Sequence, residues 1–393
     1  MIRIPSYDLS ARNTFRMKVS CALYIEIEAE EELLTLDWNA LPQPILVLGG
    51  GSNLLFTGDF PGTVLHMSLG LDQVQGSFGP GPILGTGPSP AGMASKGLEG
   101  TSGGPGPEVK IGPSPNVGWT RSKYEVDQVQ FPKGCLVTVP ANTVFDEFCA
   151  WAAAEGLWGP ENLSLIPGEV GASAVQNIGA YGVEAKDIIA DIRAYDRVEG
   201  RFVHIDPATC GYGYRTSKFK TEWQGRYIIT AVTYRLSTEP KPILDYGGVR
   251  KALEARGRGW PRVSAPVLTP QIIRDTIIGI RNQKLPDPAV TGSAGSFFCN
   301  PVVSEEVFRR IPGDPPHYVV DGGIKVPAAW LIEQCGLKGA VNGGAQVYPR
   351  QPLVIVNATG EAAPQDIIGL ENRVIEAVKA KFGITLHPEV QHV

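Results

Sequence analysis

The sequence predicts an α+β protein in which strands and helices follow one another without a regular β–α–β repeat. Apolar runs with the length and alternation of β-strands occur in both halves of the chain. The clearest amphipathic helical pattern stands near the C-terminus, so strands and helices do not alternate as in a doubly wound fold. At 393 residues, of which 43% are hydrophobic, the chain is long enough for two or three domains.

The apolar run Ile45–Leu48 predicts a buried strand that leads into a glycine-rich turn. That turn consists of Gly49, Gly50, Gly51, Ser52 and Asn53. Consecutive glycines let several backbone N–H groups face one anion, such as the pyrophosphate of a dinucleotide cofactor. Leu54 stands where the third glycine of Gly-x-Gly-x-x-Gly would fall, which disfavours a Rossmann site. A plain tight turn is the alternative. Thr63–Met67 predicts the next strand.

Glycine and proline dominate the segment from Gly76 to Gly118, where they make up 21 of 43 residues. Such a composition cannot bury enough apolar surface to offset the entropy of ordering the chain. The sequence therefore predicts a disordered insertion over residues 71–125. A long ordered loop is the alternative, but loops of this length are uncommon inside compact domains.

Beyond the insertion, apolar runs predict three more strands, at Cys135–Val139, Ile188–Tyr195 and Tyr227–Tyr234. A helix is predicted between the first two, from about Val144 to Ala154.

Three helices are predicted in the last third of the chain. The first runs from Thr269 to about Asn282, and the second covers Pro327–Gln334. The third, Pro364–Phe382, is amphipathic. Its apolar face consists of Ile367, Leu370, Val374, Ile375, Val378 and Phe382. The alternation in Ile384–Leu386 predicts a final short strand.

The charge balance and the scatter of cysteine and histidine exclude several classes of protein. A net charge of -5 argues against general nucleic-acid binding. No apolar run approaches the length of a membrane span, and the first residues lack the pattern of a secretory signal. Six cysteines without a Cys-x-x-Cys pair and five dispersed histidines predict reduced thiols and no metal site. We therefore expect a cytoplasmic protein that binds neither nucleic acid nor membrane.

A second glycine-rich block extends from Ile166 to Gly182. Its small residues would let the backbone lie against a flat ligand, with Gln176 and Asn177 as hydrogen-bonding side chains. The alternative is a glycine-containing turn between packed elements, which is less convincing when one chain carries two such blocks.

Three separate clusters carry reactive side chains. Gly211–Lys220 combines cations with aromatic rings around Arg215, and Gly292–Pro301 presents Ser296 between a glycine and two phenylalanines. Near the C-terminus Glu389 follows the last predicted strand. Taken singly, Arg215 would most often be part of a salt bridge, Ser296 a hydroxyl in a turn, and Glu389 a solvated acid on the surface. Their spacing alone does not bring them together.

In this combination the chain resembles the UDP-N-acetylenolpyruvylglucosamine reductases (UDP-N-acetylmuramate dehydrogenases), which are flavoenzymes of peptidoglycan precursor synthesis. The matching pieces run in family order through nearly the whole chain apart from the insertion, and their combination is highly specific. They are Asn13–Phe15, Leu48–Leu54, Ile166–Glu184, Tyr212–Lys220, Lys284–Pro288, Gly295–Pro301, Trp330–Gly339, Gly343–Gly344 and Pro388–Val390.

The resemblance implies a two-part FAD-binding domain of the vanillyl-alcohol-oxidase type and a C-terminal α/β substrate domain. Residues 1–70 and 126–284 would form the two FAD-binding parts, with the insertion at 71–125 between them, and residues 285–393 the substrate domain. FAD is expected to bind noncovalently. The implied cofactor-binding residues are Gly49, Gly50, Gly51, Ser52, Asn53, Pro167, Gly168, Gly171, Ala172, Ser173, Gln176, Asn177, Ile178, Gly179 and Arg281.

Three positions correspond to the family's catalytic residues. Ser296 matches the proton donor, and Arg215 and Glu389 match the pair that stabilises the enol intermediate. In the implied reaction NADPH reduces the flavin, which passes hydride to C3 of the enolpyruvyl group while Ser296 protonates C2. A preorganised cation such as Arg215 suits the negative charge that develops next to C2.

The implied substrate is a small-molecule UDP-sugar, UDP-N-acetylenolpyruvylglucosamine, and the product is UDP-N-acetylmuramate. Leu244–Gly247 stands where one type within the family carries a tyrosine-bearing loop over the substrate diphosphate, which assigns the chain to that type. Lysines and a tyrosine hydroxyl are suitable ligands for a diphosphate. The implied substrate contacts are Tyr181, Tyr214, Tyr246, Lys284, Asn300, Lys338 and Gln351. We expect a monomer.

Two other functions stay open at this point. Flavin oxidases of the same superfamily often tether FAD through a histidine near the pyrophosphate turn, but no histidine lies within Leu48–Phe56. A nucleotide-sugar binding module without catalysis would be expected to lack the proton donor or its partners. Ser296, Arg215 and Glu389 are all present. Pro140–Asn142 replaces a glycine-rich turn that in the family lies near the flavin, so the resemblance implies no cofactor contact there. Ala174 and Cys299 also depart from the family pattern, but neither change removes a catalytic group.

Overall fold

The structure, a computed structural model, describes residues 1–69, 127–257 and 268–393. All of them belong to one unit of the chain, which spans residues 1–74 and 126–393. The predicted insertion at 71–125 lies outside the described residues. Within the described ranges, no helix combines the length and the apolar character needed to cross a membrane.

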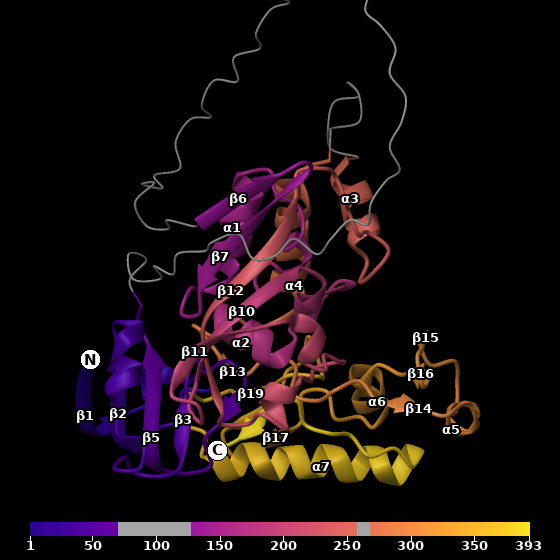
Figure 1. Ribbon diagram of the computed structural model, residues 1–393. Helices are drawn as coiled ribbons and strands as arrows, with labels where there is room; N and C mark the ends of the chain where they lie inside the picture. The colour runs from indigo at the N-terminus through magenta and orange to yellow at the C-terminus, as the bar shows by residue number, and fades with distance from the viewer. Residues whose placement is uncertain (70–126, 258–267) are drawn as a thin grey trace, which may run out of the picture. The chain divides into compact units, whose positions relative to one another are not determined.

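The N-terminal sheet leads directly into the first glycine-rich turn (Figure 1). Its strand order is β1-β2-β5-β3, with β1 antiparallel to β2 and the other neighbours parallel. Leu48 continues the pairing of β3, since its N–H donates to the carbonyl of Leu65 on β5 (2.8 Å), and the glycines follow at once. The strands are β1 (Ile2–Asp8), β2 (Ser20–Ile27), β3 (Ile45–Val47) and β5 (Phe60–Met67).

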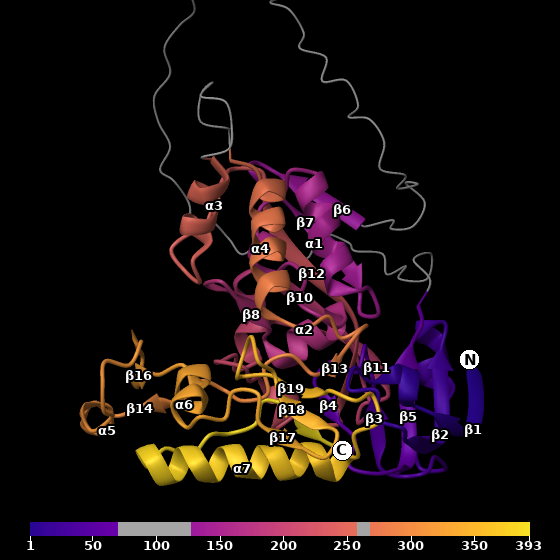
Figure 2. The same cartoon turned by 180° about the vertical axis from the view of Figure 1, so that it is seen from behind.

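A five-stranded antiparallel sheet forms the centre of the second region, in the order β11-β10-β12-β7-β6. Helices α1 and α4 pack against each other beside this sheet (Figure 2). Tyr234 on β12 anchors the packing, because its ring stacks on Phe148 of α1 with 4.5 Å between centroids. The elements are β6 (Asp127–Phe131), β7 (Gly134–Pro140), α1 (Phe145–Ala154), α2 (Val170–Gln176), β8 (Gly179–Ala180), β9 (Val183–Glu184), β10 (Ile189–Asp196), β11 (Arg201–Ile205), β12 (Tyr227–Ser237), α3 (Val249–Gly257) and α4 (Pro270–Lys284).

Helix α4 begins where the sequence predicts and ends two residues later than predicted. The hydroxyl of Thr269 accepts a hydrogen bond from the N–H of Ile272 (3.3 Å), which caps the first turn. Arg274 on this helix donates to Asp146 of α1, with 2.9 Å between Nη2 and Oδ2. Arg281 lies two helical turns further on, on the same face, so the Arg274–Asp146 pair fixes the direction in which Arg281 projects.

Two small sheets and a long helix complete the chain. Helix α7 packs against β17, β18 and β19 through its predicted apolar face, of which Ile367, Leu370, Val374 and Val378 are fully buried (Figure 1). The sheets have the orders β13-β19-β18-β17 and β14-β16-β15. The elements are β13 (Gly292–Ser293), β14 (Val302–Val303), α5 (Glu305–Arg309), β15 (Tyr318–Val320), β16 (Gly323–Lys325), α6 (Ala328–Gln334), β17 (Val341–Asn342), β18 (Ala345–Val347), β19 (Ile355–Asn357) and α7 (Pro364–Phe382).

The prediction of a strand at Ile384–Leu386 is wrong. Ile384 and Leu386 are buried and Thr385 is exposed, as the alternation predicts, but the segment belongs to no sheet. Alternation reports which side chains face the core, whereas a strand also needs a neighbouring backbone to pair with.

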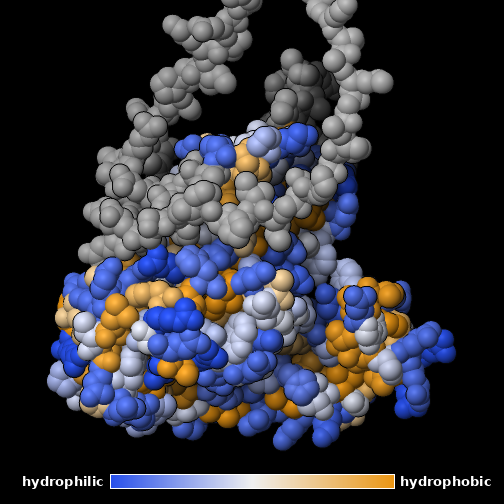
Figure 3. All heavy atoms as spheres, in the orientation of Figure 1, coloured by the Kyte–Doolittle hydropathy of each residue, from blue (hydrophilic) through white to orange (hydrophobic). Residues whose placement is uncertain are grey.

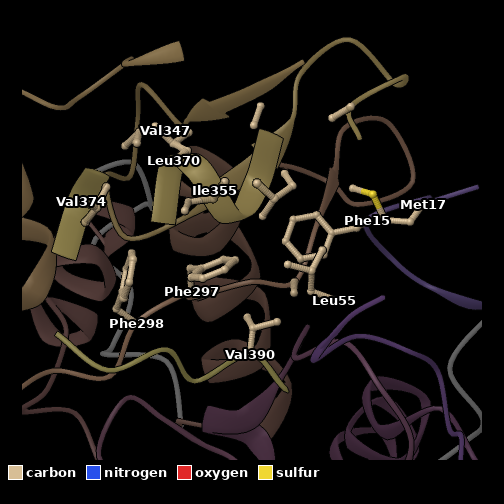
Figure 4. Packing of buried hydrophobic residues seen from close by; sticks show 14 of the residues in the cluster. Phe15, Met17, Leu55, Phe297, Phe298, Val347, Ile355, Leu370, Val374 and Val390 are labelled. Carbon is tan, nitrogen blue, oxygen red and sulfur yellow. The ribbon is translucent and has the colours of Figure 1, made fainter. Parts of the chain in front are cut away.

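The N-terminal and C-terminal parts share one hydrophobic core (Figure 4). Phe15, Met17 and Leu55 pack in the same cluster as Phe297 and Phe298 and the apolar face of α7. Backbone pairing also connects the two parts, because β20 (Gln391–His392) pairs in parallel with β4 (Leu54–Leu55). This pairing brings the last residues of the chain beside the glycine-rich turn that precedes β4.

Apolar side chains gather on the surface over the sheet β14-β16-β15 (Figure 3). Val302, Tyr318 and Val319 are exposed there. The ring of Tyr318 stacks on that of Tyr246, with 5.5 Å between centroids, so this sheet contacts the predicted tyrosine loop.

Candidate active site

A cavity of about 150 Å³ lies where the two glycine-rich blocks, helix α4 and the C-terminal segment meet. Predicted site residues that line it are Ser52, Asn53, Pro167, Gly168, Ala172, Ser173, Gln176, Ile178, Gly179, Arg215, Arg281, Ser296 and Glu389. The lining residues that the sequence did not single out are Phe145, Ile166, Glu169, Leu285, Ala294 and Gly295. The structure thus brings together the three candidate catalytic residues, which are far apart along the chain.

The first glycine-rich turn presents unpaired backbone donors. Gly51 has a φ of +60°, and a Cβ built there would lie 2.1 Å from the carbonyl oxygen of Arg12, so only glycine fits. Within the described residues, the N–H groups of residues 49–53 donate to no other residue. Ser52 closes the turn onto the second block, because its hydroxyl donates to the carbonyl of Pro167 (3.3 Å). The turn can therefore offer several N–H groups to an anion.

The second block is organised around Asn177, which ends α2 in the left-handed conformation. Its side chain is buried and fully hydrogen-bonded, donating to Glu184 (3.0 Å) and to the carbonyl of Gly213 (2.8 Å). Gly171 is also buried, and its N–H donates to the carbonyl of Ala141 (2.8 Å). These two predicted cofactor residues hold the block in shape and are not part of the cavity lining.

Arg215 and Glu389 form a half-buried ion pair, with 2.8 Å between Nε and Oε1. The guanidinium also donates to the carbonyl of Gly179, where a Cβ would lie 2.9 Å from Nη1, so the absence of a side chain permits the approach. Burial raises the pKa of Glu389, while Arg215, Gln176 and Lys220 each lower it in part. The pKa of the carboxyl lies above its ordinary value.

Backbone pairing holds Ser296 near Glu389. The N–H of Glu389 donates to the carbonyl of Phe297 (2.8 Å), and Phe297 itself is fully buried. Gly295 precedes the serine with a φ of +69°. Among the described residues none forms a hydrogen bond with the Ser296 hydroxyl, so this group is available to donate a proton to a ligand in the cavity.

None of the seven predicted substrate residues is among those that line the cavity. Asn300 donates to the hydroxyl of Tyr214 (3.4 Å), and its own oxygen accepts from the N–H of Ala328 (2.9 Å). Tyr181 lies beside Arg281, which partly offsets the rise that burial causes in the pKa of the tyrosine. Lys284 ends helix α4 and is exposed.

Lys338 and Gln351 are not part of the cavity lining. Lys338 pairs with Glu333 (2.9 Å), and Gln351 lies in a turn in which its N–H donates to the carbonyl of Tyr348 (3.2 Å).

Comparisons with known proteins identify the family. Residues 287–393 match the family described as UDP-N-acetylenolpyruvoylglucosamine reductase, C-terminal domain, and residues 125–206 match the FAD binding domain. The UDP-N-acetylenolpyruvoylglucosamine reductase of Bacteroides fragilis is 38% identical over 392 residues, which cover 98% of this chain and 99% of that protein. The chain belongs to the UDP-N-acetylenolpyruvoylglucosamine reductase family.

Further comparisons agree with this family. The reductase of the same name from Cupriavidus pinatubonensis is 38% identical over 389 residues, covering 98% of this chain and 97% of that protein. The crystal structure of UDP-N-acetylenolpyruvylglucosamine reductase from Thermus caldophilus is similar in fold, with a TM-score of 0.58 at 21% identity over 100% of this chain and 98% of that chain. The resemblance and the α+β fold class with its FAD-binding and C-terminal domains are confirmed.

The residues at the cavity fit the dinucleotide cofactor that the reductase family's FAD-binding domain implies. Arg281 lies at the cavity with its Nε buried and without a hydrogen-bond partner, and no described carboxylate pairs with it. Burial lowers its pKa from the ordinary value. A guanidinium without a carboxylate partner and a turn of unpaired N–H groups are the kinds of donor that bind a pyrophosphate.

Three ionisable residues at or near the cavity, Glu169, His66 and Lys220, had no role in the sequence analysis. A carboxylate oxygen of Glu169 lies 3.0 Å from the position of a Cβ on Gly49, and His66 lies 3.7 Å from the other oxygen, Oε1. The carboxylate of Glu169 therefore lies directly beside the glycine-rich turn. The third is Lys220, which the sequence places in a matching block without indicating a role. None of the three could be found from spacing, because their partners are distant in sequence.

Proposed function

We propose that this chain catalyses the NADPH-dependent reduction of the enolpyruvyl group of UDP-N-acetylenolpyruvylglucosamine to UDP-N-acetylmuramate, in peptidoglycan precursor synthesis. The observation that carries the proposal is the convergence of Arg215, Ser296 and Glu389 on one cavity beside the glycine-rich turn. Membership of the reductase family supports the substrate, and NADPH as the reductant rests on the resemblance to that family.

In this proposal residues 1–70 and 126–284 form the two parts of the FAD-binding domain, and residues 285–393 form the substrate-binding domain. The N–H groups of residues 49–53 and the guanidinium of Arg281 would hold the pyrophosphate, and the second glycine-rich block would contribute to the flavin site. The bound FAD would supply the redox chemistry, which is the transfer of hydride from NADPH to C3 of the enolpyruvyl group.

Hydride transfer to C3 leaves negative charge at C2, which must be stabilised and then protonated. The three proposed catalytic side chains carry out these two tasks. Arg215 stabilises the negative charge that develops on C2 and the neighbouring carboxylate, in a half-buried site where charge interactions are strong. Ser296 donates its proton to C2. Glu389 in its ionised form holds the guanidinium in place, and Gln176 donates to this carboxylate (3.2 Å).

We also propose that the enzyme works as a monomer in the cytoplasm. The six cysteines are all free thiols in the structure, which supports a reducing compartment.

The proposed reaction is tested by following NADPH oxidation by the purified protein in the presence and absence of enolpyruvyl-UDP-N-acetylglucosamine. We expect oxidation that depends on the sugar nucleotide and a product whose mass has increased by two hydrogens. Equal oxidation without the sugar nucleotide, with oxygen consumed instead, would support the flavin oxidase.

We expect FAD to be bound noncovalently. Acid precipitation should release all of the yellow chromophore into the supernatant, because no histidine lies within residues 48–56. The nearest candidate for a tether is His66, whose Nε2 lies 3.7 Å from Glu169. Flavin that stays in the pellet of the wild type and leaves the pellet of His66→Asn would contradict this expectation.

Tyr246→Phe should raise the Michaelis constant for the sugar nucleotide while leaving the flavin content unchanged. Burial raises the pKa of Tyr246, so its hydroxyl stays protonated and can donate to a diphosphate. A hydrogen bond to a charged group contributes about 1.5–3 kcal/mol, which corresponds to roughly 10- to 150-fold in affinity. Steady-state kinetics measures the change.

Tyr318→Phe is the matched control, because both variants keep the stacked rings and lose one hydroxyl. The control should keep the wild-type Michaelis constant. An unchanged constant in Tyr246→Phe would remove Tyr246 from the substrate site.

A further inference from the structure

Three polar side chains form a continuous chain of hydrogen bonds behind the cavity. Lys220, on the 3-10 turn η7 (Lys218–Lys220), donates from Nζ to Oε1 of Gln176 at 2.6 Å. Gln176 in turn donates from Nε2 to Oε1 of Glu389 at 3.2 Å. Lys220 is half-buried, and within the described residues no carboxylate lies at ion-pair distance from it.

The direction of these bonds is set by Lys220. The side-chain amide of glutamine can present either its oxygen or its NH₂ group in a given direction. An ammonium group only donates, so the oxygen of Gln176 must face Lys220. The NH₂ group must then face Glu389 and donate to one of its oxygens, and an ionised carboxylate oxygen is the stronger acceptor for this bond. A second bond from Nζ to the carbonyl of Arg215 (3.2 Å) fixes the ammonium group in this position.

We propose that Lys220 is a positioning residue for the reaction, which orients the Gln176 amide so that Glu389 is held in its ionised, hydrogen-bonded form. This inference rests on the proposed function, because it assigns Lys220 a role through the catalytic Glu389. Lys220 itself is not among the residues that line the cavity.

Four ionisable groups, Arg215, Lys220, Cys299 and Tyr214, interact electrostatically with Glu389. Arg215 and Lys220 carry positive charge, and their attraction opposes the burial that raises the pKa of the carboxyl. Cys299 stays a neutral thiol, because burial and Glu389 raise its pKa to about 11. Tyr214 stays neutral as well, since burial raises the pKa of its hydroxyl. Among the described residues, Lys220 is thus the second cation acting on Glu389, after Arg215.

Lys220→Met should lower kcat by about 10- to 150-fold with little change in the Michaelis constant, because a charge-assisted hydrogen-bond chain is lost outside the substrate contacts. The acidic limb of the pH profile of kcat should move to higher pH, since the carboxyl of Glu389 then needs a higher pH to ionise. Lys220→Arg keeps the charge and the donors and should restore part of kcat and the position of the limb. Lys218→Met, which removes a lysine two positions earlier that pairs with Glu222, is the control and should behave as wild type.

A measurement without turnover separates this inference from the proposed function. The thermal midpoints of wild type, Lys220→Met, Glu389→Gln and the double variant are compared from acid to neutral pH. Lys220→Met should cost more stability as pH rises, because an ionised Glu389 then lies buried with one compensating cation fewer. In the Glu389→Gln background this pH dependence should disappear.

If the protein turns over no sugar nucleotide but shows this pattern of thermal midpoints, the proposed function is rejected and the coupling between Lys220 and Glu389 is supported. An acidic limb that stays in place, together with an equal loss of midpoint at every pH, would overturn the inference.

Discussion

Ser296→Ala should leave the reduction of the bound flavin by NADPH near its wild-type rate and slow reoxidation by the enolpyruvyl substrate by about 10²–10⁴-fold. The serine hydroxyl lies at the cavity with Arg215 and Glu389, and no described residue forms a hydrogen bond with it. Alanine removes the proposed proton donor to C2 and leaves the proposed cofactor donors in place. Stopped-flow measurement of flavin absorbance in the two half-reactions resolves the effect.

Ser293→Ala provides a matched control for this experiment. Ser293 lies on β13, three positions before Ser296, and is buried outside the cavity lining. Both half-reactions should proceed in this variant as in the wild type. Equal slowing of both half-reactions in Ser296→Ala would mean that the serine shapes the flavin site, and its role as proton donor would be withdrawn.

Arg215→Met should slow substrate-dependent reoxidation by about 10²–10³-fold, the effect typical of removing one preorganised donor to a developing oxyanion. The variant also leaves the buried Glu389 without its closest cation, so the pKa of that carboxyl should rise further. Arg215→Lys keeps the charge but not the planar fork of donors, and should recover only part of the rate. The same stopped-flow measurement applies, with flavin content as the check on folding.

Arg309→Met tests whether the loss of any arginine has this effect. Arg309 is exposed on α5 and pairs with Glu305 four residues earlier, so the variant should match the wild type in both half-reactions. Normal reoxidation in a well-folded Arg215→Met protein would remove Arg215 from the reaction.

The regular elements could be predicted from the sequence where one face of an element is continuously buried. The apolar face of α7 repeats over five turns, and its period alone identifies the helix. The prediction at Ile384–Leu386 is wrong because the same kind of pattern reports burial and not backbone pairing. The two-residue pairing of β4 with β20 joins positions more than 300 residues apart and has no local pattern at all.

The candidate catalytic residues could be proposed only through the family resemblance, because Arg215, Ser296 and Glu389 share no spacing. The backbone bond from Glu389 to Phe297 and the ion pair of Arg215 with Glu389 bring them to one cavity. The role of Lys220 could not be predicted, because it depends on a glutamine 44 residues earlier in the chain. Contacts of this kind are set by the tertiary packing of α2 against η7.

The most direct test of the proposed reaction is a single turnover under anaerobic conditions. Enzyme whose flavin has been reduced by NADPH is mixed with enolpyruvyl-UDP-N-acetylglucosamine, and the visible flavin absorbance is followed. We expect the absorbance to return in full, with one UDP-N-acetylmuramate formed for each flavin reoxidised. Reduced flavin that persists in the presence of the sugar nucleotide and reoxidises only when oxygen is admitted would contradict the proposed function.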